Sequence, residues 1–319
     1  MTSDSSAASR ETADVVCVAS WNADLVSRVA RPIARGETLM ASDFSITPGG
    51  KGSNAAVAAA RQGASVALIA RIGDDDFGRM DMALWCAEGI ATGHVEQATG
   101  ERSGVAQILV YGDDGDNSIA VHPGAGAGLG ARHAQAAQAM LAGCRVVMAS
   151  CEVPLEATLA AFRLARRGNA VTVLNPAPAR PLPDELLALV DVLTPNESEL
   201  RELAGAAHAG SPESAAMRLL ARGAGAVMVT LGAAGCRLYR HGLAPVGLAG
   251  RAMQVADTLG AGDTFTGALA AALARGELLA TAMRWANAAA ALSVMRHGAV
   301  AGIPGRAEVA ALLGDTGDA

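Results

Sequence analysis

The sequence predicts an α/β fold: a central, mostly parallel sheet flanked by helices, with a small β-sheet lid beside it. Short β-branched runs alternate with Ala- and Leu-rich stretches of about 10 to 15 residues, which is typical of βαβ crossovers. Hydrophobic residues make up 51% of the 319 residues and are spread over short segments. Strands buried on both faces of a parallel sheet have this composition.

The strands and helices of the central sheet follow this alternation along the chain. We expect buried strands at residues 15–20, 66–72, 145–149, 171–175, 191–194 and 226–231. We expect helices between them at residues 53–62, 77–88, 155–167, 197–204 and 212–222. Gly63 and Gly89 directly follow the first two helices, where glycine commonly ends a helix in a left-handed conformation.

Two segments break the alternation, because no helical pattern separates their strands. Residues 37–48 and 103–122 have strand-like, partly alternating patterns, and DDGDN at 113–117 is typical of a hairpin turn. We expect a small antiparallel flap over one edge of the sheet, built from about 22–48 and 103–122. The predicted organisation is one domain over residues 14–314, with a disordered polar tail at 1–13 and a second tail at 315–319.

Composition excludes several classes of function. The net charge of −6 and the scattered arginines leave no basic stripe for nucleic acid. No apolar run reaches the roughly 18 residues of a membrane-spanning helix, and the first residues lack the apolar core of a secretion signal. Five cysteines without a CxxC pair suit reduced thiols, which predicts a cytoplasmic protein. The histidines have no metal-ligand spacing.

Polar side chains follow the ends of the predicted strands. They are Asn22 and Asp24, Glu152, Asn175, Asn196 with Glu199, and Thr230. Ligands of open parallel sheets bind beyond the carboxyl ends of the strands, so these side chains are candidates for one site. Four of them also have a structural alternative. Asp24 suits a solvated loop, Glu152 a helix N-terminus, and Asn196 with Glu199 a capping box.

The segment DTLGAGDTF at 257–265 is the strongest local feature. Gly260 and Gly262 allow backbone N–H groups to converge, and a helix expected at 264–275 adds partial positive charge, so the segment suits a phosphoryl group. Asp263 beside this anion hole is a candidate base for an attacking hydroxyl. The alternative is a simple glycine-rich turn with Asp263 as the N-cap.

A second glycine-rich segment, GGKGSN at 49–54, precedes the first helix. It is not a Walker A loop, because its lysine does not precede Ser or Thr directly. Asn54 can offer a donor and an acceptor to a hydroxyl, although a plain strand-to-helix turn explains the glycines equally well. The run GAGAGLG at 124–130 lacks the strand and the acid of a dinucleotide fingerprint.

Together, GGKGSN and DTLGAGDTF resemble the two signatures of the PfkB (ribokinase) sugar-kinase family, over about residues 15–313. The segments SWNAD, SCEVPLE, NPAPA, LTPNESE and TLGAAG are similar to the ribokinase branch. The resemblance implies one α/β domain with a β-lid that often forms a homodimer, and transfer of the ATP γ-phosphoryl group to a sugar hydroxyl.

The resemblance also implies roles for individual residues. Asp263 would be the base and would contact the sugar, and the N–H groups of Gly260, Ala261 and Gly262 the anion hole. The sugar would contact Asn22, Asp24, Gly50, Lys51, Asn54 and Glu152. The nucleotide would contact Asn196, Thr230, Leu231, Gly232, Gly235, Gly262 and Asn287. Glu199 would order Mg²⁺ through water, and K⁺ would be held by Asp257, Leu259, Ser293, Arg296, Gly298 and Gly302.

Three residues depart from what is usual in the family. Trp21 replaces a smaller aliphatic residue, and we expect its bulk to affect the sugar pocket. Gly302 stands where a serine often helps to hold K⁺, and Asn287 where histidine also occurs. The implied activity is phosphorylation of D-ribose to ribose 5-phosphate. The alternatives are a family kinase for a nucleoside, fructose or a related sugar, and a non-catalytic sugar-binding regulator.

Overall fold

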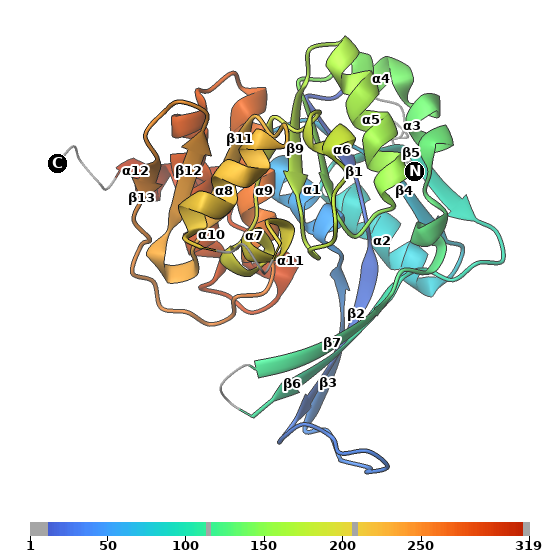
Figure 1. Cartoon of the computed structure of the whole chain (residues 1–319). Coiled ribbons are helices and arrows are strands. Elements are labelled where there is room, and N and C mark those ends of the chain that lie inside the picture. Colours follow the sequence, from blue (N-terminus) through green and yellow to red (C-terminus); the bar gives the residue numbers. More distant parts are fainter. Residues whose placement is uncertain (1–11, 113–115, 206–209, 315–319) are drawn as a thin grey trace.

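The computed structural model describes residues 12–112, 116–205 and 210–314, and in this part the chain forms two sheets (Figure 1). The larger sheet has nine strands in the order β13-β12-β11-β10-β9-β8-β1-β4-β5. Seven of them pair in parallel, and at one edge β12 pairs antiparallel with both β11 and β13. The predicted α/β class is confirmed. Of the tails expected at 1–13 and 315–319 and the turn expected at 113–117, residues 1–11, 315–319 and 113–115 lie outside the described residues. The predicted tail is wrong for Ala13, which is buried in the core, and the predicted turn is wrong for Asp116 and Asn117, which begin β7.

The strands of the large sheet agree closely with the β-branched runs of the sequence. Their bounds are β1 Val15–Val18, β4 Val66–Gly73, β5 Ala91–Ala98, β8 Val146–Ser150, β9 Val171–Asn175, β10 Val192–Leu193, β11 Ala226–Thr230, β12 Cys236–Arg240 and β13 Val246–Leu248. Strand β5 and the antiparallel edge were not predicted, because their residues are more polar and more exposed than those of the central strands.

Helices cover both faces of the large sheet and enclose two hydrophobic cores. One face carries α3 Ala131–Ala136, α4 Gln138–Gly143, α5 Leu155–Arg167, α6 Asp184–Leu187, α7 Glu197–Leu203 and α8 Pro212–Ala221. The other carries α1 Lys51–Arg61, α2 Asp76–Ala87, α9 Ala261–Ala274, α10 Leu279–Ser293 and α12 Arg306–Gly314. Successive residues of β1 enter opposite cores, Val16 the first and Cys17 the second.

Helix α9 packs closely against α1, and this contact sets the spacing of the two glycine-rich segments. A Cβ atom on Gly267 would lie 2.1 Å from the carbonyl oxygen of Ala55, so only glycine allows this approach. Helix α9 begins at Ala261, three residues before the expected start. Asp263 therefore lies inside the first turn, and the N-cap is Gly260 in a left-handed conformation (φ 74°). The alternative that Asp263 is the N-cap is wrong.

The four remaining strands form a separate sheet, called the small sheet below, that projects from the body (Figure 1). Its order is β3-β2-β6-β7, with bounds β2 Asn22–Val29, β3 Asp43–Gly49, β6 Val105–Tyr111 and β7 Asp116–His122. The expected flap was purely antiparallel, and this is wrong for β2 and β6, which pair in parallel. The chain between β2 and β6 passes through β3, α1, β4, α2 and β5, so the two strands are not joined by a hairpin and can pair in parallel. Residues 37–42 are not strand.

No helix in the described ranges is both long and apolar enough to cross a bilayer.

Candidate active site

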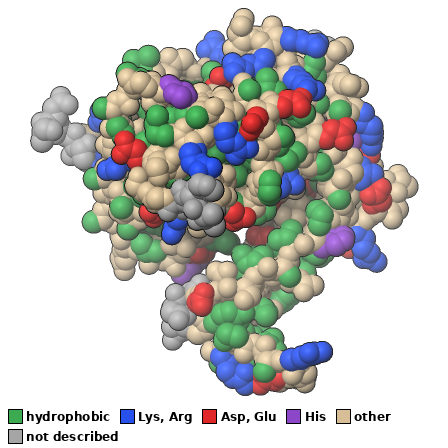
Figure 2. Space-filling model, viewed as in Figure 1, with side chains coloured by type: hydrophobic (Ala, Val, Ile, Leu, Met, Phe, Trp, Pro, Cys, Tyr) green, Lys and Arg blue, Asp and Glu red, His purple; other side chains and the backbone are tan. Residues whose placement is uncertain are grey.

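A cleft of about 960 Å³ opens between the carboxyl ends of the parallel strands and the small sheet. Figure 2 shows the hollow between the rounded body and the projecting sheet. A smaller pocket of about 90 Å³ adjoins the cleft under the small sheet. Five residues line both cavities: Lys51, Ile108, Leu259, Gly260 and Asp263. The pocket and the cleft thus meet at the start of α9.

Asp263 is buried at this junction and held by two amide side chains. Asn54 donates from Nδ2 to Oδ2 at 2.9 Å, and Asn175 from Nδ2 to Oδ1 at 3.5 Å. Burial raises the pKa of Asp263 to about 6, and the charges of Glu152 and Glu199 add to this increase. The positive charge of Lys51 and the hydrogen bond from Asn54 act in the opposite direction.

The backbone beside Asp263 has the form predicted for an anion hole. No side chain caps the N-terminus of α9. The N–H of Ala261 makes a long bond of 3.4 Å to the carbonyl of Thr258, and the N–H groups of Gly260 and Gly262 are left for a ligand or for water. Gly262 faces open space, since a Cβ atom there would meet no heavy atom within 4 Å. The helix dipole and these N–H groups together favour an anion at Gly260, Ala261 and Gly262.

Asp24 on β2 faces the pocket from the small sheet. A Cβ atom on Gly49 would lie 2.2 Å from Oδ2 of Asp24, so the carboxyl group packs against glycine backbone. Burial raises the pKa of Asp24 to about 7, and the negative charges of Glu152 and Asp263 raise it further, while Lys51 lowers it. The alternative of a solvated loop acid is wrong. Asn22, also buried, lines the same pocket.

Glu152 connects three segments at the base of the pocket. Its Oε2 accepts hydrogen bonds from Oγ of Ser20 at 2.7 Å and from the backbone N–H of Lys51 at 2.8 Å. Ser20 in turn accepts from the N–H of Gly52 at 3.0 Å. Lys51 is the first residue of α1, so Glu152 satisfies a free N–H group at the start of that helix. The carboxylate of Glu152 therefore accepts a hydrogen bond at the N-terminus of α1, and not at that of α5, the helix that follows it in sequence.

Lys51 brings the positive charge to a site that is otherwise acidic. Its side chain is half-buried, and the charge of Asp263 is the main cause that raises its pKa, with Glu152, Glu199 and Asp24 contributing. Gly50 before it has a φ of 88°, and a Cβ atom there would lie 2.6 Å from Cα of Trp21. Glycine is therefore required where the chain turns from β3 into α1.

Trp21 lies in the hydrophobic core between the sheet and α1, with 5% of its surface exposed. It lines neither the pocket nor the cleft. The expected direct effect of its bulk on the sugar pocket is therefore wrong. The side chain follows the apolar face of the segment after β1, while the neighbouring Asn22 faces the pocket.

Asn196 and Glu199 form the predicted capping box at the start of α7. Oδ1 of Asn196 accepts from the N–H of Glu199 at 2.8 Å, and Oε2 of Glu199 accepts from the N–H of Asn196 at 2.9 Å. The structural alternative is confirmed for both residues. Both also line the cleft, and burial is the main cause that raises the pKa of Glu199.

The other residues predicted to contact the nucleotide lie around the end of β11. Thr230 lines the cleft, whereas Leu231, Gly232, Gly235 and Asn287 are not part of its lining. Gly235 has a φ of 95° and packs against the backbone of Leu248. A Cβ atom on Gly235 would lie 2.1 Å from the carbonyl oxygen of Leu248. Asn287 on α10 donates to the carbonyl of Ala249 at 3.1 Å. Thr230 is therefore part of the cleft wall, and Leu231, Gly232, Gly235 and Asn287, called the rim below, are not.

Of the other five residues predicted for K⁺, Asp257 is hydrogen-bonded to two. Its Oδ1 accepts from the N–H of Leu259 and its Oδ2 from the N–H of Gly298, both at 2.9 Å. The carbonyl oxygens of Ser293 and Arg296 both lie near Gly302. A Cβ atom on Gly302 would be 2.6 Å from the first and 3.4 Å from the second. Carbonyl and carboxylate oxygens are suitable ligands for K⁺, so this donor set fits the ion.

Sequence analysis gave no role to Ser20, Thr194 and His297, and it named Asn175 as a candidate without a specific role. Asn175 contacts Asp263, Ser20 supports Glu152, and Thr194 and His297 line the cleft. Ser20, Asn175 and Thr194 end predicted strands, which was the available signal for them. For His297 the sequence offered no signal beyond its place next to Gly298.

The comparisons with known proteins agree with this geometry. A family model described as pfkB family carbohydrate kinase matches residues 12–306. The ribokinase of Haemophilus influenzae is 39% identical over 296 residues, which cover 92% of this chain and 96% of that protein.

Solved structures extend the match to the whole fold. The crystal structure of Thermotoga maritima ribokinase has a TM-score of 0.87 at 33% identity, with 95% of this chain and 99% of that chain covered. Arabidopsis thaliana ribokinase, solved with ribose and ATP, has a TM-score of 0.87 at 30% identity and the same coverage. The chain belongs to the pfkB family of carbohydrate kinases.

Proposed function

We propose that this carbohydrate kinase transfers the γ-phosphoryl group of ATP to D-ribose, giving ribose 5-phosphate and ADP. The observation that carries the proposal is the position of Asp263, which lines both the small pocket and the large cleft. A sugar in the pocket and a triphosphate in the cleft meet at this carboxylate. The ribokinase relatives, one of them solved with ribose and ATP, support ribose as the sugar.

The pocket suits a small polyol. It is lined by the polar side chains of Asn22, Asp24, Lys51, Asn54 and Glu152. Oδ1 of Asn54 is buried and has no hydrogen-bond partner in the described structure, while its Nδ2 is used by Asp263. A sugar hydroxyl that donates to Oδ1 would satisfy this atom, whose burial is otherwise unfavourable. Asn54 would thus join the sugar to the catalytic carboxylate.

The mechanism follows from the arrangement around Asp263. The ionised carboxylate accepts the proton of the primary hydroxyl, whose oxygen attacks the γ-phosphorus in line with the leaving β-phosphate oxygen. The first-turn N–H groups of α9 stabilise the negative charge on the transferred group. Closure of the small sheet over the pocket would exclude water, which limits hydrolysis of ATP.

Mg²⁺ would enter with the nucleotide and neutralise charge on its phosphates. In the described ranges no three acidic, histidine or cysteine side chains are grouped to hold a metal by themselves. Magnesium usually keeps several waters and binds through one or two carboxylates and the phosphates. Glu199, which faces the cleft, fits the part of a water-mediated contact. Asn196 and the rim beyond β11 would hold the nucleotide.

We further propose that K⁺ binds at Asp257 and the other five residues predicted for it. We also propose that two copies of the chain form a homodimer through the small sheet. Phe44 and Ile46 on β3 are 58% and 45% exposed, and they alternate with Ser45 and Thr47, which line the cleft. An apolar outer face of this kind suits association with a second copy. Sedimentation of the Phe44→Ser variant tests the dimer.

We also propose that residues 14–314 form a single domain. The free cysteines support a cytoplasmic location.

A panel of sugars and nucleosides in an ADP-release assay, with K⁺ and with Na⁺, tests the activity. We expect the highest kcat/KM for ribose and a higher rate with K⁺. A higher kcat/KM for fructose or adenosine would reject ribose as the substrate. Tight ribose binding without phosphoryl transfer at any Mg²⁺ concentration would instead favour a sugar-binding regulator.

A further inference from the structure

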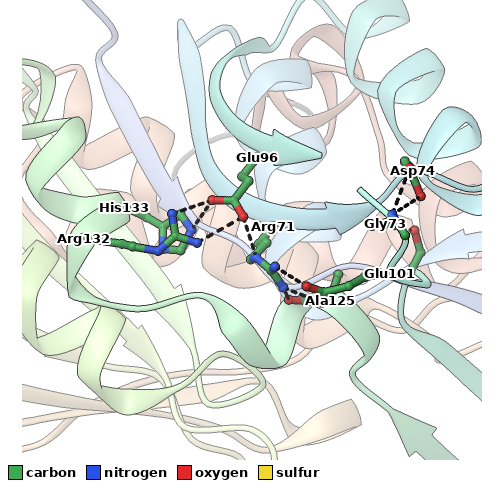
Figure 3. Close-up of polar contacts among 10 residues, drawn as sticks. Arg71, Gly73, Asp74, Glu96, Glu101, Ala125, Arg132 and His133 are labelled. Atoms are coloured by element: carbon green, nitrogen blue, oxygen red, sulfur yellow. Dashed lines mark hydrogen bonds and ion pairs between the residues drawn. The ribbon is translucent and has the colours of Figure 1, made fainter. Parts of the chain in front are cut away.

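The small sheet is joined to the body on one side by a cluster of ion pairs around Arg71. The chain enters β6 through residues 99–104 and leaves β7 through residues 123–130. Arg71 on β4 contacts both connections (Figure 3). It donates to both carboxylate oxygens of Glu101, at 2.5 and 2.7 Å, and to the carbonyl of Ala125 at 2.6 Å. One guanidinium therefore holds both roots of the β6–β7 hairpin.

The other end of the cluster fixes Arg71 to the body. Its Nε donates to Oε1 of Glu96 on β5 at 2.8 Å. Glu96 also pairs with Arg132 at 2.7 Å and with Nε2 of His133 at 2.9 Å, both on α3. Gly128 lies flat against the guanidinium, because a Cβ atom there would be 2.5 Å from Nη1. Only 11% of the Arg71 side chain is exposed, whereas its partners Glu96 and Glu101 are 30% and 48% exposed.

The root of β6 is continuous with the sugar pocket. Ser103, two residues after Glu101, is held by Asp75 through its N–H at 2.9 Å and its Oγ at 2.6 Å. The next residue, Gly104, accepts from the N–H of Ala23 at 2.9 Å. A Cβ atom on Gly104 would lie 2.5 Å from Oδ1 of Asn22, so this backbone sits directly against a pocket side chain.

The hairpin itself forms one wall of the pocket. Ala106 and Ile108 of β6 and Ile119 and Val121 of β7 line it. Ile119 and Val121 are half exposed, so few body contacts hold this part of the wall in place. Its position over the sugar therefore depends on the pairing of β6 with β2 and on how its two roots are fixed.

We propose that Arg71 is a positioning residue for the sugar, which fixes the β6–β7 wall and, through Gly104, the side chain of Asn22. The inference rests on the proposed function. Arg71 touches neither ligand cavity, and it acts through Glu101 and Ala125. The planar guanidinium, with five donors in a fixed fork, serves Glu96, Glu101 and Ala125 at the same time. A lysine in its place cannot span the three acceptors.

The test compares Arg71→Lys and Arg71→Met with Arg132→Gln. Arg132 belongs to the same cluster and pairs with Glu96, but it makes no contact with either root of the hairpin. We expect both Arg71 variants to raise the KM and the calorimetric Kd for ribose by about 10- to 100-fold, as a small displacement of positioning groups does. The KM for ATP should rise less, because only Ile108, Val110 and Asn117 of the hairpin line the cleft. Arg132→Gln should leave both KM values unchanged.

The outcomes separate this inference from the proposed function. If the native protein neither binds nor phosphorylates ribose, the proposed function fails, whatever the variants do. If it does both and the Arg71 variants bind ribose equally well, the positioning role is wrong. An equal rise of both KM values, or a rise with Arg132→Gln, shows general loosening of the fold and also overturns it. Glu101→Gln, which leaves the contacts to Glu96 and Ala125, replaces the Arg71 variants if they do not fold, with a smaller rise expected for ribose alone.

Discussion

Nδ2 of Asn54 lies 2.9 Å from Oδ2 of Asp263, although 209 residues separate the two in sequence. This hydrogen bond joins the first turns of α1 and α9, and with them the two glycine-rich segments. It gives Asn54 two tasks at once, because Nδ2 holds the carboxylate while Oδ1 remains for the sugar. The sugar pocket and the base are therefore one structural unit.

Replacement of the base tests the mechanism directly. We expect Asp263→Asn to bind ribose and ATP but to lose about 10²- to 10⁴-fold in kcat, because the amide cannot accept the proton of the hydroxyl. Calorimetry gives the binding and an ADP-release assay gives the rate. A kcat near that of the native protein would remove Asp263 as the base.

The pH dependence of the reaction follows from the same carboxylate. The ionised form of Asp263 is active, and its pKa in the ligand-free protein is about 6, so kcat/KM should fall as the pH drops through 6. The bond from Asn54 lowers this pKa, so its loss in Asn54→Ala raises the pKa and moves the acidic limb to higher pH. Asn175→Ala, which removes a bond of 3.5 Å, should move the limb less. An unmoved limb in Asn54→Ala would contradict the assignment.

Trp21 should matter for stability and not for the choice of sugar. We expect Trp21→Ala to lower the free energy of unfolding by ~3–5 kcal/mol, as is usual when a large core side chain is removed. Trp21→Phe should fold and keep the native ratio of kcat/KM for ribose over fructose, because residue 21 lines neither cavity. Denaturant unfolding and the substrate panel measure the two effects. A changed sugar preference in Trp21→Phe would show that the core position does reach the pocket.

Asp81 on α2 should make the stability of the protein depend on pH. Its side chain is fully buried, neither carboxylate oxygen has a hydrogen-bond partner in the described structure, and burial raises its pKa well above the ordinary value. The unfolded chain releases this proton near pH 4 and the folded chain only at higher pH, so the native state loses stability as the pH rises between these values.

Asp81→Asn removes the titrating group and should cancel this loss. We expect the variant to gain stability over the native protein at pH 8, by about 1.4 kcal/mol for each unit by which the native pKa is raised, and to match it near pH 4. Asp76→Asn is the control on the same helix, because the side chain of Asp76 is 93% exposed. A pH-independent difference between Asp81→Asn and the native protein would show that the carboxyl group ionises freely in the folded state.

The elements of the fold that could be predicted are those with a local cause. The β-branched runs placed the central strands within one or two residues, since hydrophobic burial on both sheet faces leaves that pattern. The capping box of Asn196 and Glu199 was predictable for the same reason, because its two partners are three residues apart. The family signatures indicated the glycines at positions 260 and 262 and the acid at 263.

Other features depend on segments that meet only in the folded chain. The core position of Trp21, the parallel pairing of β2 with β6 and the contact of Asn175 with Asp263 all fall in this group. Nothing in the local pattern distinguishes a tryptophan that faces the pocket from one that faces the core.

The sequence alone therefore determined the α/β class, the two glycine-rich helix starts and the candidate base, because backbone conformation and hydrophobic period are properties of neighbouring residues. Only the tertiary structure decided which side chains surround that base and that Arg71 holds the root of the small sheet. The partners of Arg71 at 96, 101 and 125 lie on three segments, and their distances depend on the packing of the whole sheet.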